Sequence, residues 1–181
     1  GMIGDPSLKN SERSFLSEEQ LRHNEQSIYH QLQNFLENIK KNYNIKFDYE
    51  MVDNYDFYKD MNYLKFLREV GKYITVNTMM AKESVKKRIE DSEKSITYAE
   101  FSYMLIQGYD FLYQFENYGV NIQLGGSDQR GNITTGMEII RKKLDKEAYC
   151  LTIPLITDAS GAKYGKSEGN AVRVDRKKNS P

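Results

Sequence analysis

Residues 124–133 contain a pattern that could bind an anionic ligand. Two glycines are followed by Ser127, Asp128 and Gln129, between an extended run and a segment with helical spacing. Glycines lack a Cβ, so the backbone can approach a ligand, and the free N–H groups of a following helix favour an anion. A tight turn with a capping Ser or Asp is the alternative. The pattern alone therefore leaves a ligand site and a capped turn open.

Two groups of cations could act on phosphates. Lys163 and Lys166 lie among glycines, with Ser167 directly after them. Lysines on a mobile loop suit phosphate charge that develops during a reaction. Lys9 and Arg13 are four residues apart, so they would share one face of a helix and could hold a polyanion. In both groups, a solvated surface is the alternative.

Three polar side chains form a stripe in an otherwise apolar segment. A capping box at Thr97 and Glu100 opens this segment, which predicts a buried helix that ends near residue 119. Tyr103, Gln107 and Asp110 lie at i, i+4 and i+7, on one face of that helix. Buried polar groups are costly unless they are paired. The stripe therefore either pairs within the protein or lines a polar pocket.

The surrounding elements predict an α/β fold. Helical spacing is found over 17–42, 64–70 and 79–85, and strand patterns over 46–51 and 151–156. The first helix opens with a capping box at Ser17 and Gln20, and the third has Asn77 or Thr78 as its expected cap. The first strand ends at Asn54, either a site residue or ordinary turn chemistry, and the second should be buried.

Composition excludes several classes of protein. Lys+Arg and Asp+Glu are balanced at 26 each, so overall charge predicts no nucleic-acid coat. The single cysteine, Cys150, excludes an intramolecular disulfide, and two histidines with one cysteine argue against a zinc site. No apolar run approaches the ~20 residues of a membrane span. Residues 1–6 read as the end of a buried strand and a turn, so we expect a piece of a longer protein.

Four signals in one order resemble the catalytic domain of bacterial-type tyrosyl-tRNA synthetases, which are class I aminoacyl-tRNA synthetases. They are Gly4–Ser7, the Tyr103 stripe, Gly125–Asn132 and Lys163–Ser167. The closest matches are YMLIQGYDFL (103–112), LGGSDQRGNI (124–133) and KYGKS (163–167), which resembles the family's KMSKS-type loop. The resemblance implies a Rossmann-like catalytic domain over 1–181, truncated at both ends, with a mainly helical connective region at about 55–119.

The family's activity is the joining of tyrosine to its tRNA. The resemblance implies that L-tyrosine and ATP, with Mg²⁺ accompanying ATP, give tyrosyl-adenylate and pyrophosphate, and that tyrosine then passes to tRNA(Tyr). No tightly bound cofactor and no metal ligands are expected. The full-length protein is expected to be a homodimer, away from membranes, in the cytoplasm or an organellar matrix.

The resemblance assigns seven residues to tyrosine: Tyr103, Gln107, Asp110, Asp5, Gln129, Gln123 and Asn54. Asp110 is expected to bind the phenolic hydroxyl, which suits tyrosine better than the indole of the related tryptophan enzyme. Tyr103, Gln107 and Asp5 are expected to hold the α-amino group. Gln129 or Gln123 is expected near the carboxylate, and Asn54 falls where the family has an Asn that lines the site.

The resemblance assigns a second set of residues to ATP. Asp128 is expected to bond the ribose hydroxyls, and Gly125 and Gly126 to give the nucleotide close passage. The residues expected to hold the phosphates as pyrophosphate leaves are Lys163, Lys166, Ser167, Lys9 and Arg13.

The chain departs from the family pattern at several points. The HIGH-type segment and the C-terminal anticodon-recognising and tRNA-binding regions are absent, so the chain alone is expected to be inactive. Leu8 replaces a usual Gly, and Arg130 an aromatic residue. One alternative is a synthetase-derived RNA-binding or splicing-cofactor protein without aminoacylation, against which Lys163, Lys166 and Asp128 argue. A plain structural α/β domain is the other.

Overall fold

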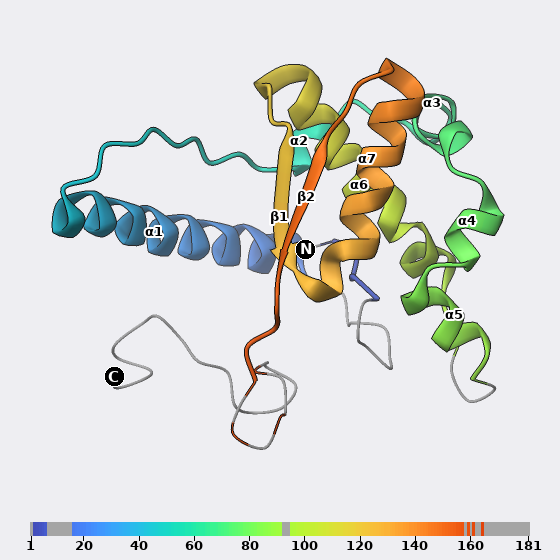
Figure 1. Ribbon diagram of the computed structural model, residues 1–181, viewed down its shortest axis with the longest axis horizontal. Helices are drawn as coiled ribbons and strands as arrows, with labels where there is room; N and C mark the ends of the chain where they lie inside the picture. Colours follow the sequence, from blue (N-terminus) through green and yellow to red (C-terminus); the bar gives the residue numbers. More distant parts are fainter. Residues whose placement is uncertain are drawn as a thin grey trace. The chain divides into compact units, whose positions relative to one another are not determined.

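The computed structural model describes residues 2–6, 16–91, 95–157, 159, 161 and 164. These residues form two compact units (Figure 1). The larger unit holds residues 3–6 and 53–155, and the smaller holds residue 2, residues 16–52 and the described residues from 156 onward. Within the described residues, the smaller unit contains one helix, and all the other elements belong to the larger unit.

Helices dominate the described chain, and its two strands precede and follow its last helix. The elements in order are α1 (Glu18–Tyr43), α2 (Tyr55–Tyr58), α3 (Tyr63–Glu69), η1 (Gly71–Tyr73), α4 (Val76–Met80), α5 (Glu83–Ile89), α6 (Tyr98–Tyr118), β1 (Ile122–Gly126), η2 (Ser127–Gln129), α7 (Arg130–Leu144) and β2 (Tyr149–Ile153). No helix in the described residues is long and apolar enough to cross a membrane.

The helix of the smaller unit, α1, begins at its predicted cap. The Ser17 hydroxyl accepts a hydrogen bond from the Gln20 backbone N–H at 3.2 Å. Only the Ser17 half of the box is formed, and the Gln20 amide nitrogen donates to Asn24 Oδ1 at 3.0 Å. On the predicted apolar face, Ile28 is 57% exposed and Phe35 is 53% exposed. The sequence therefore predicted where this helix starts, but none of its residues is fully buried.

Two predicted strands are wrong. Residues 2–6 and 46–51 contain no strand. In the second segment, the Tyr49 hydroxyl donates to Glu37 at 2.9 Å, and the Lys40 ammonium lies 4.7 Å from the centre of the Tyr49 ring. Alternating apolar residues indicate which side chains can pack, whereas a strand also needs a neighbouring backbone to pair with. Within the described residues neither segment pairs with one.

The single helix predicted over 79–85 is two helices, α4 and α5. Lys82 between them is extended (φ −64°, ψ 134°). Met79 and Val85, six residues apart, would point about 120° apart on one continuous helix, and the break allows both to be buried. The predicted caps, Asn77 and Thr78, are also wrong, because the cap of α4 is Thr75, whose hydroxyl accepts from the Thr78 N–H.

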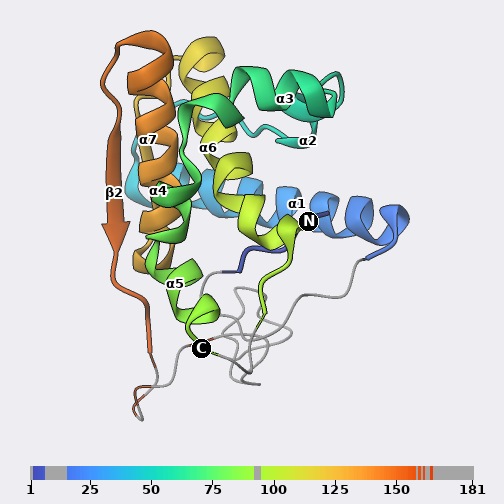
Figure 2. The same cartoon turned by 90° about the vertical axis from the view of Figure 1, so that its right-hand side faces the viewer.

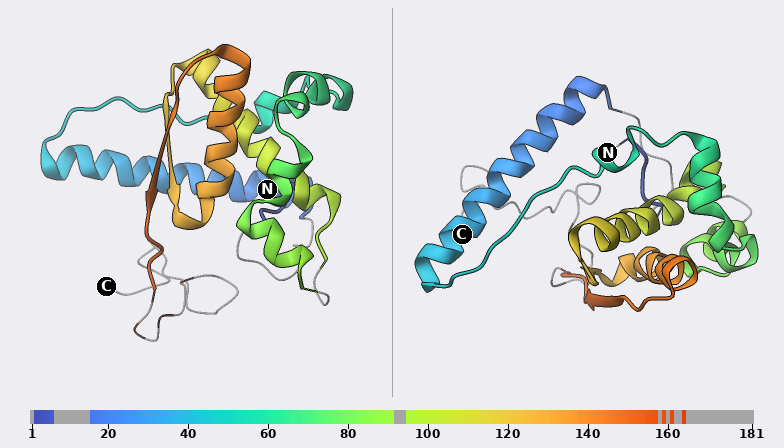
Figure 3. Two further views of the ribbon diagram at one scale, coloured as in Figure 1. Left: turned by 45° about the vertical axis from the view of Figure 1, so that its right-hand side comes forward. Right: turned by 90° about the horizontal axis from the view of Figure 1, so that it is seen from above.

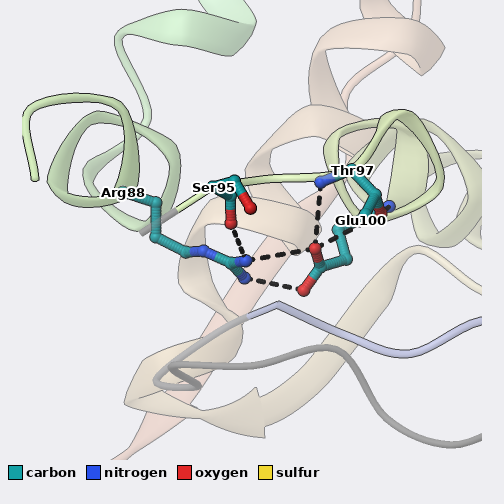
Figure 4. Close-up of polar contacts among 4 residues, drawn as sticks. All are labelled: Arg88, Ser95, Thr97 and Glu100. Atoms are coloured by element: carbon teal, nitrogen blue, oxygen red, sulfur yellow. Dashed lines mark hydrogen bonds and ion pairs between the residues drawn. The ribbon is translucent and has the colours of Figure 1, made fainter. Parts of the chain in front are cut away.

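The long helix α6 has both of its predicted ends. Thr97 and Glu100 form a reciprocal capping box, and Gly119 ends the helix in the left-handed conformation (φ 68°). Glu100 also accepts from both terminal nitrogens of Arg88, at 2.6 and 3.1 Å, and Arg88 donates to the Ser95 carbonyl (Figure 4). Arg88 is 6% exposed and Glu100 is 3% exposed. This buried ion pair joins the end of α5 to the start of α6.

Helices α6 and α7 form the centre of the larger unit. Their largest fully buried side chains are Phe111, Leu112, Ile133, Ile139 and Ile140. A glycine of each helix lies against the other helix. A Cβ on Gly108 would lie 2.8 Å from Ile139 Cδ1, and a Cβ on Gly136 would lie 2.9 Å from Phe111 Cβ. The two helices therefore approach each other more closely than larger residues would allow.

Strands β1 and β2 form a parallel pair joined through α7, which confirms the α/β class. The register pairs Ile122 with Tyr149 and Gly126 with Ile153. Figures 2 and 3 show α7 between the strand pair and α6. The prediction that the second strand is buried is wrong, because Leu151 and Ile153 are 57% and 55% exposed. Helix α7 covers one face of the pair, and no described element covers the other.

Candidate functional site

Asp110 on α6 is the half-buried carboxylate of the predicted stripe. The Asn54 amide donates to its Oδ2 at 3.0 Å, and the Tyr58 hydroxyl donates to its Oδ1 at 2.8 Å. Burial raises the pKa of Asp110 above its usual range, and the two hydrogen bonds oppose part of this rise. A carboxylate has about four acceptor sites, so Asp110 can also accept a hydrogen bond from a ligand.

Asn54 and Tyr58 are placed by α2. The turn before this short helix is closed by Asp53, whose carboxylate accepts from the Tyr55 N–H at 2.9 Å. The Asn54 side chain makes no cap hydrogen bond and bonds Asp110 instead of stabilising the turn. Sequence reasoning missed Tyr58. The available signal was its position one helical turn after Asn54, the residue that the sequence had indicated.

Gln107, the middle residue of the stripe, contacts β1. The Gln107 amide donates to Gln123 Oε1 at 3.5 Å, at the outer limit of a hydrogen bond. Tyr103 lies one turn earlier on α6 and is half-buried. The structure therefore brings Gln107 and Gln123 together from different elements, as expected if both line one site.

Asp5 and Gln129 meet although 124 residues separate them. The Gln129 amide donates to Asp5 Oδ2 at 2.7 Å. The Asn132 amide donates to Asp5 Oδ1 at 3.4 Å and to Gln129 Oε1 at 3.3 Å. Sequence reasoning gave no role to Asn132, which is 5% exposed. Its spacing of three residues from Gln129 was the signal, because such residues are neighbours on a helix.

Contacts within the protein explain why the two residues at 125 and 126 are glycines. A Cβ on Gly125 would lie 2.9 Å from Gln129 Cβ, and a Cβ on Gly126 would lie 2.6 Å from Asp128 Oδ1. Gly126 and Gln129 occupy the cap positions of η2 and α7, and neither makes a side-chain cap hydrogen bond. The glycines therefore make room for the two polar side chains that follow them.

The predicted phosphate-binding residues fall outside the described part of the chain. They are Lys9, Arg13, Lys163, Lys166 and Ser167. Leu8, one of the departures from the family pattern, lies there too. Among the residues that the structure does describe, no three His, Cys, Asp or Glu side chains gather into a group that could hold a metal ion.

The described side chains offer hydrogen-bond acceptors for a hydroxyl and for a cation, and a donor for a carboxylate. Asp110 is an acceptor suited to a hydroxyl, and Asp5 is an acceptor suited to a cation. Gln129 offers an amide donor that suits a carboxylate, and Asp128 beside it offers further acceptors. Asp110 stands on α6, Asp128 and Gln129 stand on η2, and Asp5 lies in the segment before α1. Side chains of these kinds are suited to a hydroxyl, an ammonium and a carboxylate group.

Comparison with known proteins gives one consistent family. The model of the family described as "tRNA synthetases class I (W and Y)" matches residues 1–181. A tyrosine–tRNA ligase of Amoebophilus asiaticus is 53% identical over 181 residues, covering 100% of this chain and 41% of the relative. A tyrosine–tRNA ligase of Parabacteroides distasonis is 51% identical over 182 residues, covering 100% of this chain and 42% of the relative.

Solved structures agree with the sequence matches. A C-terminally truncated mitochondrial tyrosyl-tRNA synthetase of Coccidioides posadasii matches with a TM-score of 0.76 and 27% identity, over 98% of this chain and 51% of that one. The corresponding Aspergillus nidulans structure matches with a TM-score of 0.73 and 26% identity, over 92% of this chain and 52% of that one.

The family model covers the whole chain, whereas the chain spans only about two fifths of the length of the curated relatives. The fold is that of a class I tRNA synthetase catalytic domain, as the sequence predicted. This chain therefore belongs to the class I tRNA synthetases of the tryptophan and tyrosine group.

Proposed function

We propose that the full-length protein containing this chain is a tyrosine–tRNA ligase. The carboxylate of L-tyrosine attacks the α-phosphorus of ATP, and the bond to the leaving pyrophosphate breaks. A ribose hydroxyl of the terminal adenosine of tRNA(Tyr) then attacks the carbonyl carbon, and AMP leaves. Residues 1–181 are part of the catalytic domain, with a helical connective region at about 55–119. The names of the relatives at 51–53% identity support this assignment.

The observation that carries the proposal is Asp110 with its two donors. A phenol can donate to this half-buried carboxylate, whereas phenylalanine would leave it without that bond. Sites built to bond a hydroxyl reject analogues that lack one by a large factor, an effect established for tyrosine enzymes of this group. Asn54 is proposed to line the same end of the tyrosine site, because its amide donates to the other carboxylate oxygen of Asp110.

The amino-acid end of the substrate is proposed to bind near Asp5. Asp5, with Tyr103 and Gln107, holds the α-ammonium group, and Gln129 or Gln123 approaches the carboxylate. In the free protein Gln129 donates to Asp5 at 2.7 Å. A ligand that carries an ammonium and a carboxylate can replace this contact with one partner for each residue, which supports the assignment.

ATP is proposed to bind at the start of α7. Asp128 takes the ribose hydroxyls, and the backbone at Gly125 and Gly126 gives the nucleotide passage. Mg²⁺ accompanies ATP, and since this ion keeps several waters and binds largely through substrate phosphates, no protein cage is required. The residues proposed to hold the phosphates are Lys163, Lys166, Ser167, Lys9 and Arg13. Catalysis is then positioning and charge stabilisation, without a nucleophilic side chain.

Tyrosine-dependent ATP–pyrophosphate exchange on the full-length protein tests the proposal. Labelled pyrophosphate is expected to be incorporated into ATP only when tyrosine is present, and phenylalanine is expected to replace tyrosine poorly. Absence of exchange with every amino acid would contradict the ligase assignment. Specific RNA binding by that inactive protein would instead favour the synthetase-derived RNA-binding alternative.

The full-length protein is further proposed to be a homodimer. Sedimentation equilibrium is expected to give twice the mass of one chain. A monomer at concentrations that support full exchange activity would contradict this part of the proposal.

A further inference from the structure

The Tyr58 hydroxyl lies between two acceptors. It is within hydrogen-bonding distance of the Ile106 carbonyl and of Asp110 Oδ1, the latter at 2.8 Å. A hydroxyl carries only one proton to donate, so it cannot serve both acceptors at once. With Asn54 on Oδ2, this cluster has more acceptors than donors. A ligand hydroxyl brings the donor that the cluster lacks.

Packing fixes the Tyr58 ring independently of these bonds. The ring makes an edge contact with Tyr109, with centres 5.2 Å apart at an angle of 66°. It also lies beside Phe66 at 6.5 Å. The hydroxyl is therefore held at its position by the aromatic core between α2, α3 and α6. Such support keeps a binding group in one geometry before the ligand arrives.

We propose that Tyr58 is a positioning residue for tyrosine selection, which holds the Asp110 carboxylate ionised and aimed so that a substrate phenol can donate to it. This role rests on the proposed ligase function. Tyr58 acts through Asp110: its hydroxyl donates to Oδ1 at 2.8 Å and keeps this bond when the substrate phenol donates to a further acceptor site of the same carboxylate.

The charges around the pair agree with this role. Burial raises the pKa of Asp110, and the hydrogen bonds from Asn54 and Tyr58 oppose the rise. Burial, followed by the charge of Asp110, raises the pKa of Tyr58 far above its usual value, with smaller contributions from Tyr109 and Tyr103. Tyr58 therefore remains a donor at any working pH. Loss of its hydroxyl is expected to raise the pKa of Asp110 further.

The test is Tyr58→Phe in the full-length protein, assayed by tyrosine-dependent exchange. KM for tyrosine is expected to rise about tenfold, the effect of one hydrogen bond to a charged group, while kcat changes little. The control is Tyr113→Phe, a neighbouring α6 tyrosine whose ring stacks on Phe57 at 4.2 Å. The control is expected to leave KM for tyrosine unchanged.

Two further readouts separate positioning from a structural effect. The acid limb of the pH profile of kcat/KM is expected to move to higher pH in Tyr58→Phe, because a protonated Asp110 cannot accept from the phenol. In an Asp110→Asn background, Tyr58→Phe is expected to change KM for tyrosine less than about twofold. Tyr58 acts through the Asp110 carboxylate, so its effect is expected to be lost once that carboxylate is removed.

The outcomes for the two proposals differ. Exchange in the unsubstituted protein, with an unchanged or lower KM in Tyr58→Phe, would overturn the role of Tyr58 and leave the ligase function standing. An equal rise of KM in the Tyr113→Phe control would overturn it as well. Absence of exchange in the unsubstituted protein would overturn both proposals.

Discussion

Helix α6 carries a buried carboxylate, Glu100, and a half-buried one, Asp110, in very different surroundings. Glu100, in the first turn, accepts from the Arg88 guanidinium at 2.6 and 3.1 Å and from the Thr97 N–H at 3.0 Å. Burial pushes its pKa up, but the bonds from Arg88 and Thr97 outweigh burial and lower it. The side-chain donors to Asp110 are the neutral Asn54 and Tyr58, and there burial prevails and raises the pKa.

The difference separates a structural carboxylate from a binding one. A buried ion whose partners include a cation and a helix cap contributes to holding two elements together. A half-buried carboxylate whose side-chain donors are neutral can still accept further hydrogen bonds, and its charge makes folding less favourable. Natural sites retain such groups where function needs them. Glu100 therefore fits the first description and Asp110 the second.

The largest effect is expected from breaking the structural pair. Arg88→Met keeps most of the side-chain volume but leaves Glu100 buried without its cation. Breaking a buried pair from one side typically costs about 3–5 kcal/mol. The free energy of unfolding, measured by urea titration of the full-length protein, is expected to fall by that amount.

The matched control is Lys87→Met, the preceding residue on α5. Lys87 pairs with Glu83 at 2.6 Å, but both side chains are exposed, at 69% and 82%. Exposed pairs contribute about 0–1 kcal/mol, so this variant is expected to unfold almost as the unsubstituted protein does. Equal losses in the two variants would show that burial of the Arg88 pair has no special weight.

The second prediction makes the same chemical change at both carboxylates. Asp110→Asn is expected to raise KM for tyrosine about a hundredfold, because a hydrogen bond to a charged group is lost, while the protein becomes no less stable. Glu100→Gln is expected to leave KM unchanged and to lower the free energy of unfolding. Exchange kinetics and urea titration of both variants provide the measurements.

Reversed outcomes would break the comparison. If Asp110→Asn destabilised the protein as much as Glu100→Gln does, Asp110 would be a structural residue. If tyrosine bound the Asp110→Asn variant with undiminished affinity, the assignment of Asp110 to the phenolic hydroxyl would be wrong.

The sequence predicted the cap bonds of Glu100 and the helix position of Asp110, but not the Arg88 partner of the first or the Tyr58 partner of the second. The capping box at Thr97 and Glu100 is local chemistry within four residues, and the structure confirms it. The helical stripe also placed Asp110 correctly. Its partner Tyr58 lies 52 residues away, and no periodicity reports contact between such distant residues. The Arg88 pair was missed because Arg88 directly follows Lys86 and Lys87, and three adjacent basic residues near a helix end are favoured there without a specific partner.

The failed strand predictions have the same physical origin. Residues 46–51 alternate as a half-buried strand does, but the pattern cannot say whether a partner backbone lies beside them. The pattern over 151–156 predicted a strand correctly, and β2 spans Tyr149–Ile153, yet it could not say that Leu151 would be exposed. Burial and pairing depend on the neighbouring elements. The assignments to Lys9, Arg13 and the Lys163–Ser167 loop stay predictions, because these residues lie outside the described part of the chain.

The third prediction compares the two carboxylates by pH. The pKa of Glu100 is lowered from 4.5, so its stabilising effect is present above about pH 4.5 and is lost as pH falls through the folded-state pKa. The pKa of Asp110 is raised from 3.8, so its unfavourable effect grows as pH rises from 3.8 through its folded-state pKa. Glu100→Gln is expected to lower the free energy of unfolding, and Asp110→Asn is expected to raise it. Both differences from the unsubstituted protein are expected to become smaller toward low pH.

Urea titrations at several pH values between about 3 and 7 would measure both differences. Parallel curves for the two variants and the unsubstituted protein would mean that neither group has a shifted pKa. If both variants changed the free energy of unfolding in the same direction, the contrast between the two sites would be contradicted.

The smallest effect is expected at the cap itself. Thr97→Ala removes the hydroxyl that accepts from the Glu100 N–H at 3.3 Å, but it keeps the Thr97 backbone N–H that donates to the Glu100 carboxylate. Loss of a cap typically costs about 1 kcal/mol. Because the Arg88 bonds remain, the loss should be well below that of Arg88→Met, while Thr97→Ser, which keeps a hydroxyl, should lose less. If Thr97→Ala cost as much as Arg88→Met, the cap rather than the ion pair would hold Glu100, and the distinction between a carboxylate held by a cation and one held by neutral donors would not explain the difference between the two ends of α6.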